Sequence, residues 1–592
     1  MRIPLAAVAA LSLVAGCGRE KPIAPTVVPG CTALAPSATG PGDTENLFPL
    51  AAGNTRIFRA IGEGGQFTFR ESVLAGTMRD GATVFPVPLV SLDPLGSSAG
   101  GYFSNGPSGI AVHAAQGYAG ELAGAYPHVT LRWPLVAGDR YRTVNCTRVG
   151  TGQDLDGDGV EDTVSFYDEV TVDGIEPVRH VVGVREAWKV TTREHQRFFY
   201  SSGLPPLSVV LGQASWFAPG LGRVRTQLLV DEPPVATREE LLIGWSFPGV
   251  GRRGVQELVG VRATGALEGG ATAHVAGRSV VVWSEPDRAS PGTWRLLSAS
   301  IPEGASAAPA PAVVATGFAG PVTPRIAGLG DRVLVTVGAV GWRLGADGQR
   351  LDPEAGLALG GTEEARPLAG SGAWTIVAQG PEGFRLRRLS LAGVLDAAVT
   401  VPGTAAVPGA WAAAWTGEGY LLAWFTDGVR PVALRVSAAG APLDAAPRVL
   451  ATDGTAGWIS TAGGGGAGLV AWDPGRGVRV DAAGQLLDAT PMTLGSDGVD
   501  GAVTFAYDGA RFIRAWDLGS VRVDTVPLDG ATPALSVFDG FEPGFPVAQV
   551  LNVSLTGLDA PGDGDVYVTW RREPANADVV SPPMLYLARV AF

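Results

Sequence analysis

The sequence predicts a mainly β fold, and two features of its composition and pattern indicate this. The chain of 592 residues contains 84 glycines and 45 prolines, and its apolar residues occur in short runs between these turn-forming residues. Apolar residues at the i, i+3, i+4, i+7 spacing of an amphipathic helix are sparse, so we expect few helices. With 46% hydrophobic and 17% charged residues, the chain can bury cores for roughly two to four domains.

The N-terminus has the pattern of an export signal that ends at a cysteine. Arg2 is followed by an apolar run over residues 3–14, which is too short to span a bilayer. Residues 14–17, Val-Ala-Gly-Cys, resemble the lipobox of bacterial lipoproteins. This resemblance implies a signal peptide over residues 1–17 and acylation of Cys17 with palmitate-like chains that anchor the protein to a membrane. The alternative is an ordinary cleaved signal with a chance cysteine.

The residue after that cysteine bears on the membrane that would hold the protein. In some bacteria an aspartate at this position retains a lipoprotein in the inner membrane, and this chain has Gly18 instead. We therefore expect the outer membrane, and the sequence leaves open which side of it the protein faces. Beyond the signal, no apolar stretch approaches the length of about 18 residues that a transmembrane helix needs, so a lipid is the only membrane attachment that we expect.

Two further segments precede the repeats described below. Residues 18–45 are rich in Pro, Ala, Gly and Thr without periodicity, so we expect a flexible tether. Residues 46–245 contain alternating strand candidates and are expected to form one antiparallel β domain. The segments that begin at Phe48, Trp133 and Trp216 resemble a β-rich domain common in bacterial lipoproteins of unassigned function, and this resemblance implies no catalytic residues.

The remaining residues, 246–592, contain a repeated strand that usually ends in tryptophan. Five copies carry the tryptophan and two weaker copies lack it. The copies are residues 279–283, 333–337, 375–379, 420–424, 468–472, 512–516 and 566–570. Their last residues lie 54, 42, 45, 48, 44 and 54 positions apart. A period of about 48 residues with several strands per unit is typical of a β-propeller.

We therefore expect a β-propeller with seven blades, with six or eight as the alternatives. The last copy lacks an outer strand, which residues 255–261 can supply next to residues 585–590, and this pairing would close the ring. We expect the repeated tryptophans to pack between blades rather than to bind sugar. Trp294, Trp411 and Trp458 lie outside the pattern and are better candidates for contact with a ligand.

A second repeated element follows several of these strands. It reads RLGADGQRLD at residues 343–352, RVSAAGAPLD at 435–444 and RVDAAGQLLD at 479–488, and RLSLAGVLD at 388–396 is one residue shorter. Each copy predicts a strand, a hairpin turn centred on glycine and the start of an outer strand.

A single acidic loop is the sharpest candidate for a metal site. Residues 154–162 read DLDGDGVED, so Asp154, Asp156, Asp158 and Asp162 occupy positions 1, 3, 5 and 9, and Val160 at position 7 would add its carbonyl. Hard oxygen ligands at this spacing suit Ca²⁺, and the glycines let the loop wrap tightly. The loop resembles the integrin-type (FG-GAP-like) calcium loops that lie between strands, which implies a structural calcium. The alternative is an acidic surface turn.

Two cysteines remain after Cys17. In an exported protein, a leftover pair more often forms a disulfide than two free thiols, so we expect Cys31 and Cys146 to be bonded. Such a bond would join the end of the tether to the first domain.

Catalytic patterns are weak throughout the chain. Residues 96–100 match G-x-S-x-G, but glycines and an extended segment follow instead of a helix, so we interpret this segment as a loop. The five histidines lack the spacing of zinc ligands. The net charge is −13 and the chain has no basic run, which argues against nucleic-acid binding.

These observations favour a non-catalytic lipoprotein whose propeller binds a protein or glycan ligand or acts as a scaffold. The alternative is a propeller hydrolase or lyase that acts on extracellular polysaccharide, because a ring of blades can bring distant loops to one funnel. A cluster of carboxylates with arginine or histidine at the centre of one ring face would favour the enzyme.

Overall fold

The computed structural model contains only β structure in the residues that it describes. No helix occurs among them, and hence none that is long and apolar enough to cross a membrane. The described residues are 30–34, 43–62, 65–79, 82–92, 99–115, 126–151, 153–180, 183–230, 235–263, 266–305, 307–360, 364–404, 410–452, 454, 457–494, 503–517, 521–526, 535–536, 552–561, 565–573 and 584–591. The expected signal peptide and Cys17 lie outside these ranges.

The chain divides into two compact units, Met1–Arg253 and Gly254–Phe592. The domains expected from the sequence meet at residues 245 and 246. The structural division falls a little later, because strand β14 (Val235–Phe247) continues across that point and most of β15 (Gly251–Arg262) pairs within the second unit.

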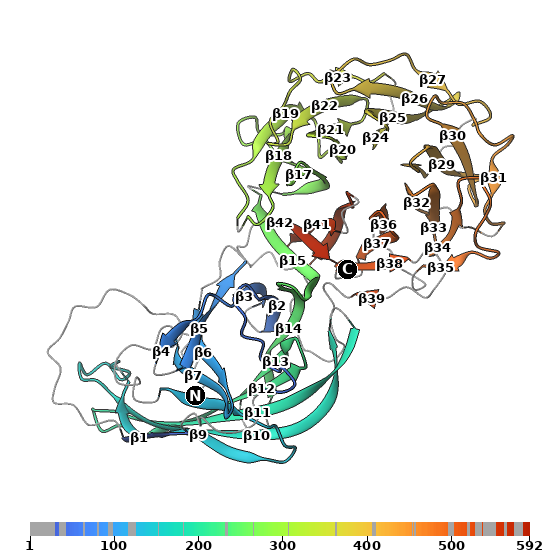
Figure 1. Cartoon of the computed structure of the whole chain (residues 1–592). Helices are drawn as coiled ribbons and strands as arrows, with labels where there is room; N and C mark the ends of the chain where they lie inside the picture. Colours follow the sequence, from blue (N-terminus) through green and yellow to red (C-terminus); the bar gives the residue numbers. More distant parts are fainter. Residues whose placement is uncertain are drawn as a thin grey trace. The chain divides into compact units, whose positions relative to one another are not determined.

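Unit 1 is a long antiparallel series of strands (Figure 1). Its remaining strands are β1 (Gly30–Ala33), β2 (Thr55–Gly62), β3 (Gly65–Ser72), β4 (Thr77–Arg79), β5 (Ala82–Ser91), β6 (Ala99–Gly106), β7 (Gly109–Ala115), β8 (His128–Arg132), β9 (Arg140–Gly150), β10 (Thr163–His180), β11 (Gly183–Phe199), β12 (Leu207–Ala218) and β13 (Gly222–Val230). They pair in the order β8-β7-β6-β5-β3-β2-β14-β13-β12-β11-β10-β9-β1, with β4 next to β5.

The two ends of this series are bridged by one residue. The Leu34 amide donates to the Thr143 carbonyl of β9 over 2.7 Å, and the Val129 amide of β8 donates to the Leu34 carbonyl over 2.9 Å. Two hydrogen bonds through Leu34 thus connect β8 to β9 at this junction.

The core of unit 1 follows from the alternation of residues along β10 and β11. Val170, Val172 and Val190 pack with Ile110 and Trp133 in one buried cluster, while the intervening residues point to the opposite face. A second cluster gathers aromatic and small residues of β2, β3, β12 and β14.

Unit 2 begins with six four-stranded antiparallel sheets that follow one another around a circle (Figure 1). Their strands are β16 (Glu268–Val275), β17 (Arg278–Pro286), β18 (Trp294–Pro302), β19 (Ala312–Phe318); β20 (Arg325–Leu329), β21 (Arg332–Val337), β22 (Val340–Gly345), β23 (Leu357–Ala358); β24 (Ala365–Ala369), β25 (Ala373–Gly380), β26 (Gly383–Ser390), β27 (Val399–Thr400); β28 (Trp411–Trp415), β29 (Gly419–Thr426), β30 (Arg430–Ser437), β31 (Arg448–Val449); β32 (Ile459–Gly464), β33 (Ala467–Trp472), β34 (Arg476–Val480), β35 (Met492–Thr493); β36 (Val503–Tyr507), β37 (Phe512–Asp517), β38 (Val521–Val526) and β39 (Leu535–Ser536).

The last three strands, β40 (Asn552–Asp559), β41 (Asp565–Glu573) and β42 (Met584–Ala591), pair in order, and β42 pairs with β15. Val255 lies opposite Val590 and Val261 opposite Leu585, which is the pairing that the sequence predicts. The first strand of each sheet contacts the first strand of the next, from β16 through β40, and β40 in turn contacts β16.

The repeated strands of the sequence all become the second strand of a sheet. They lie in β17, β21, β25, β29, β33, β37 and β41. The tryptophans that end five of them, residues 283, 424, 472, 516 and 570, are between 0% and 6% exposed. The prediction that they pack in the core is confirmed.

The second repeated element forms an ion pair between its first and last residues. Arg343 donates from its backbone amide to the Asp352 carboxylate over 2.7 Å and from Nε to the same group over 3.1 Å. Arg435 with Asp444 and Arg479 with Asp488 repeat this geometry. The predicted strand and hairpin turn are present. The residues after the turn make only a single bridge, however, and the outer strand proper comes later.

Arginine side chains of this element also reach the neighbouring sheet. The Arg343 Nη1 donates to the Leu391 carbonyl in the next hairpin turn over 2.7 Å, and Arg435 donates to the Ala482 carbonyl in the same way. We call this Arg–Asp pair with its bond to the next turn the arginine clasp. In the shorter copy, the described residues Arg388 and Asp396 form no ion pair, and Arg387 instead donates to the Leu359 carbonyl over 2.7 Å.

The clasp constrains the glycine of the turn that receives it. A Cβ on Gly393 would lie 2.5 Å from the Arg343 guanidinium, and one on Gly484 would lie 2.5 Å from the Arg435 Nε. Both glycines have positive φ, so they meet two separate requirements.

We expect Gly393→Ala to destabilise unit 2 by about 2–4 kcal/mol, because alanine strains the positive φ and displaces a guanidinium held by Asp352 and Leu391. The matched control is Gly372→Ala. Its φ of +73° is similar, and a Cβ there meets no atom within 4 Å, so it should cost only about 1–2 kcal/mol. Denaturant unfolding followed by tryptophan fluorescence measures both, and equal losses would contradict the clasp.

Candidate functional site

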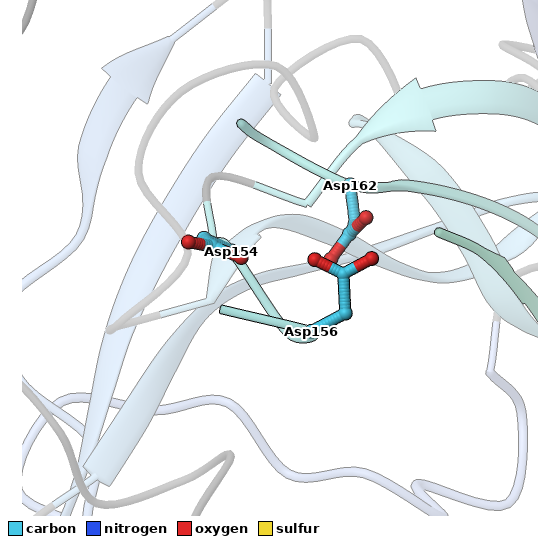
Figure 2. A group of neighbouring side chains, drawn as sticks. All are labelled: Asp154, Asp156 and Asp162. Atoms are coloured by element: carbon cyan, nitrogen blue, oxygen red, sulfur yellow. The ribbon is translucent and has the colours of Figure 1, made fainter. Parts of the chain in front are cut away.

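The acidic loop lies between β9 and β10 and brings three of the predicted ligands together. One carboxylate oxygen from each of Asp154, Asp156 and Asp162 lies within 4.8 Å of the others. Figure 2 shows the carboxylates of Asp156 and Asp162 directed toward each other. Gly157 and Gly159, with φ of +83° and +89°, allow the tight wrap of the loop.

Asp158, another predicted ligand, lies outside this group. Asp158 accepts from the Ser201 hydroxyl over 2.7 Å and from the Val160 amide over 2.8 Å. The Val160 side chain is exposed. A cation at this site would therefore meet three gathered carboxylates, and Asp158 would have to leave Ser201 to join them.

Two serines, which the sequence did not point to, also bond to the carboxylates of the loop. The Ser202 hydroxyl donates to Asp156 over 2.5 Å, and the Ser201 amide donates to Asp162 over 2.7 Å. Both serines follow β11, whose end pairs with the start of β10 (Phe199 opposite Thr163). Residues 163–199 form an antiparallel hairpin, which brings the turn after β11 back next to the acidic loop. Recognising this hairpin in the strand pattern would therefore have pointed to Ser201 and Ser202.

Hydrogen bonds already stabilise the charged form of the loop. The Ser202 hydroxyl is the main reason that the pKa of Asp156 lies below its ordinary value. Asp154 accepts from the amides of Gly157 and Gly159 over 2.6 and 2.7 Å. The loop thus offers several ionised oxygen donors in a small space, the chemistry that Ca²⁺ prefers.

The two cysteines expected to pair lie opposite each other in the β1–β9 ladder. Their Cα atoms are 4.0 Å apart and their Sγ atoms 2.01 Å apart. β1 lies inside residues 18–45, which the sequence predicts to be a flexible tether, so this part of the segment is instead a strand held to β9 by the disulfide and by backbone pairing.

Other candidates from the sequence do not gather into a site within the described residues. Ser98 of the G-x-S-x-G segment lies outside those residues. His113 accepts or donates a hydrogen bond with Ser104 over 2.8 Å, but both are at most 8% exposed and cannot meet a large substrate. The prediction that Trp411 is an exposed contact residue is wrong: it is 6% exposed, because it packs against Phe384 in the core.

A partly buried acidic pair lies inside unit 1, and the sequence did not point to it. Asp168 of β10 lies directly opposite Glu194 of β11. Burial, and next the charge of Glu194, raise the pKa of Asp168 to about 7, while a hydrogen bond from Thr143 partly offsets this. The side chain therefore changes charge near neutral pH.

No protein-family description matches the chain, and no characterised protein matches its sequence. The fold is similar to a candidate lipoprotein from Parabacteroides distasonis, with 13% identity over 34% of this chain and 98% of the other and a TM-score of 0.22. It is similar to a candidate exported protein with a YmcC-like fold from Bacteroides fragilis, with 12% identity, the same coverage and a TM-score of 0.20. It is also similar to apo AztD from Citrobacter koseri, with 12% identity over 62% and 95% of the two chains and a TM-score of 0.30. Similarity at this level carries no argument about function.

We expect Asp168→Asn to stabilise unit 1 at pH 8 by about 1–3 kcal/mol and to have little effect at pH 4. Because the folded pKa lies near 7 and the unfolded value is 3.8, ionisation of Asp168 opposes folding increasingly as pH rises through this window. Thermal unfolding at both pH values measures the difference. Asp173→Asn on the same strand, an exposed residue, is the control, and equal shifts in the two variants would contradict the assignment.

Proposed function

We propose that the chain is an exported lipoprotein, anchored through Cys17 to the outer membrane, that binds a protein or glycan ligand or acts as a scaffold without catalysis. Unit 2 is proposed to do this as a seven-bladed β-propeller. The chain of contacts from β16 through β40 and back to β16 supports that architecture, as does the pairing of β15 with β42.

The proposal of a non-catalytic role rests on one observation: the charged residues of the repeats are paired with one another. An ion pair with the aspartate of the same repeat engages each guanidinium of Arg343, Arg435 and Arg479. Arg514 likewise pairs with the fully buried Asp524. An enzyme needs carboxylates and arginines that converge on open space, whereas these pairs join residues within one sheet, and Arg343 and Arg435 also bond to the next sheet.

The proposed anchor agrees with the order of parts along the chain. Cys17 would carry the lipid, the tether would follow, and the Cys31–Cys146 disulfide would mark the point where folded structure begins. Two or more acyl chains on one residue suffice for stable attachment.

The acidic loop is proposed to bind a structural Ca²⁺. Asp154, Asp156 and Asp162 would be the first ligands, joined by Asp158 and the carbonyl of Val160. Because Ser201 and Ser202 already bond to these carboxylates, the ion would stabilise the loop together with the turn after β11.

We expect millimolar Ca²⁺ to raise the unfolding midpoint of unit 1, and a chelator to reverse this, in the chain from Gly18 onward. A ligand present at about 100 times its Kd adds about 2.7 kcal/mol to the folded state. Asp162→Asn should remove the effect, because it deletes one of the three gathered carboxylates. Glu186→Gln, an exposed change on β11, should leave it intact. An unchanged midpoint in the parent protein would dismiss the calcium site.

The function as a whole is tested by expressing the full chain and its Cys17→Ser variant with labelled palmitate. We expect label and membrane association in the parent protein and neither in the variant. The purified parent protein should leave the chain length of acidic and neutral polysaccharides unchanged, with no new reducing or unsaturated ends.

The two readouts separate the parts of the proposal. Unlabelled protein in both strains would overturn the lipid anchor but not the binding role. New chain ends that depend on the protein would overturn the non-catalytic role in favour of a propeller hydrolase or lyase.

A further inference from the structure

One face of the β9–β10–β11 sheet carries a row of exposed arginines that the proposed function does not use. Along β10, Val164, Asp168 and Val170 turn toward the core, while Ser165, Tyr167 and Glu169 alternate with them on the opposite face. Their partners on β11 continue this face, which we call the arginine face. The exposed arginines on this face come from two of the strands, Arg140, Arg142 and Arg148 from β9 and Arg193 and Arg197 from β11.

The charge of the arginine face is opposite to that of the whole protein. Glu169 is the carboxylate at its centre, in register with Arg142 on one side and Arg193 on the other. Asp173 lies at one end, where it accepts from Thr191. Five arginines against two carboxylates leave a positive face on a chain whose net charge is −13.

Aromatic rings hold three of these guanidiniums in place. Arg142 lies 4.2 Å from the centre of the Tyr167 ring, whose other side stacks on His195 at 4.5 Å. Arg148 and Arg197 lie 3.4 and 5.2 Å from the centre of the Phe199 ring. A stacked guanidinium keeps its N–H edge directed to solvent, where it can bond to a carboxylate, sulfate or phosphate.

These three arginines differ from those of the repeats in one respect. Within the described part of the chain, no carboxylate lies within ion-pair distance of Arg142, Arg148 or Arg197, whereas Arg343 and Arg435 are each paired with an aspartate. An ordered cation that has no anionic partner in the protein can bind an anion from outside it.

We propose that the arginine face binds an anionic polysaccharide. The arginines lie on β9 and β11, two strand spacings or about 10 Å apart, with β10 between them, so the face presents several cations across a width that suits a polymer with repeated charges. The exposed residues Asn145, Thr147 and Ser208 next to the arginines can bond to sugar hydroxyls. A single-stranded nucleic acid fits less well, because both sides of Tyr167 are already covered and offer no surface on which a base can stack.

This inference rests on the export of the protein, the first part of the proposed function, and is independent of the propeller. Its test uses the purified chain from Gly18 onward, so a failure of lipid anchoring in cells does not affect the result.

Binding to polygalacturonate is measured by calorimetry at low and high salt, with neutral dextran as the uncharged comparison. We expect binding to polygalacturonate but not to dextran, and a loss of affinity as salt rises. The triple variant Arg142→Gln, Arg148→Gln and Arg197→Gln should bind at least about tenfold more weakly, since each exposed charge contributes about two- to fivefold. The matched control is Arg185→Gln, an exposed arginine near the far end of β11.

Unfolding curves show whether the triple variant is folded, and the single variant Arg142→Gln, with a loss of about two- to fivefold, serves if it is not. The proposal is overturned if the variants bind as well as the parent protein, or if no binding is seen. It is also overturned if vesicles of phosphatidylglycerol or a single-stranded oligonucleotide bind at this face and polygalacturonate does not.

Discussion

The arginine clasp is the side-chain interaction that ties neighbouring sheets of unit 2 together at two of their junctions. Five of the six four-stranded sheets in the described residues have outer strands of only two residues, so a sheet could slide against its neighbour. The clasp prevents this, because Arg343 is fixed by Asp352 and donates to a carbonyl of the next hairpin turn. A guanidinium with several donors in a rigid plane can satisfy both partners at once, which lysine cannot do. The near absence of lysine from the chain agrees with this use of arginine.

Unit 1 uses the same chemistry without a repeat. Arg56 is 1% exposed and donates to Glu71 over 2.6 Å and to the Leu221 carbonyl over 2.8 Å. Burial lowers the pKa of Arg56, and the Glu71 charge opposes this shift. One buried arginine thus connects β2, β3 and the turn before β13. On the outward side of the sheet, by contrast, arginines stack on aromatic rings and keep their donors exposed. The position of each arginine relative to the sheet decides whether it supports the fold or keeps its donors exposed.

Much of unit 2 could be predicted because its information is local and repeated. A strand that ends in tryptophan recurs at a nearly constant spacing, and one wrong assignment among seven would not change the pattern. The prediction for Trp411 was wrong for a related reason. This residue starts a strand instead of ending one, so the spacing did not identify it as a core residue. In the acidic loop, three of the five predicted ligands lie together, as their spacing predicts, and the bound cation stays a prediction. Ser201 and Ser202 were missed, because they come from a separate turn.

The sequence by itself determined the all-β character, the second strands of the sheets, the buried tryptophans and the pairing of residues 255–261 with the last strand. Those features depend on local alternation and on period. Only the tertiary structure decided that Asp168 meets Glu194, that Arg343 reaches the next sheet and that arginines from two strands, β9 and β11, share one face. These contacts depend on register between segments far apart in the chain, and a shift of one residue in a strand would turn each side chain to the opposite face.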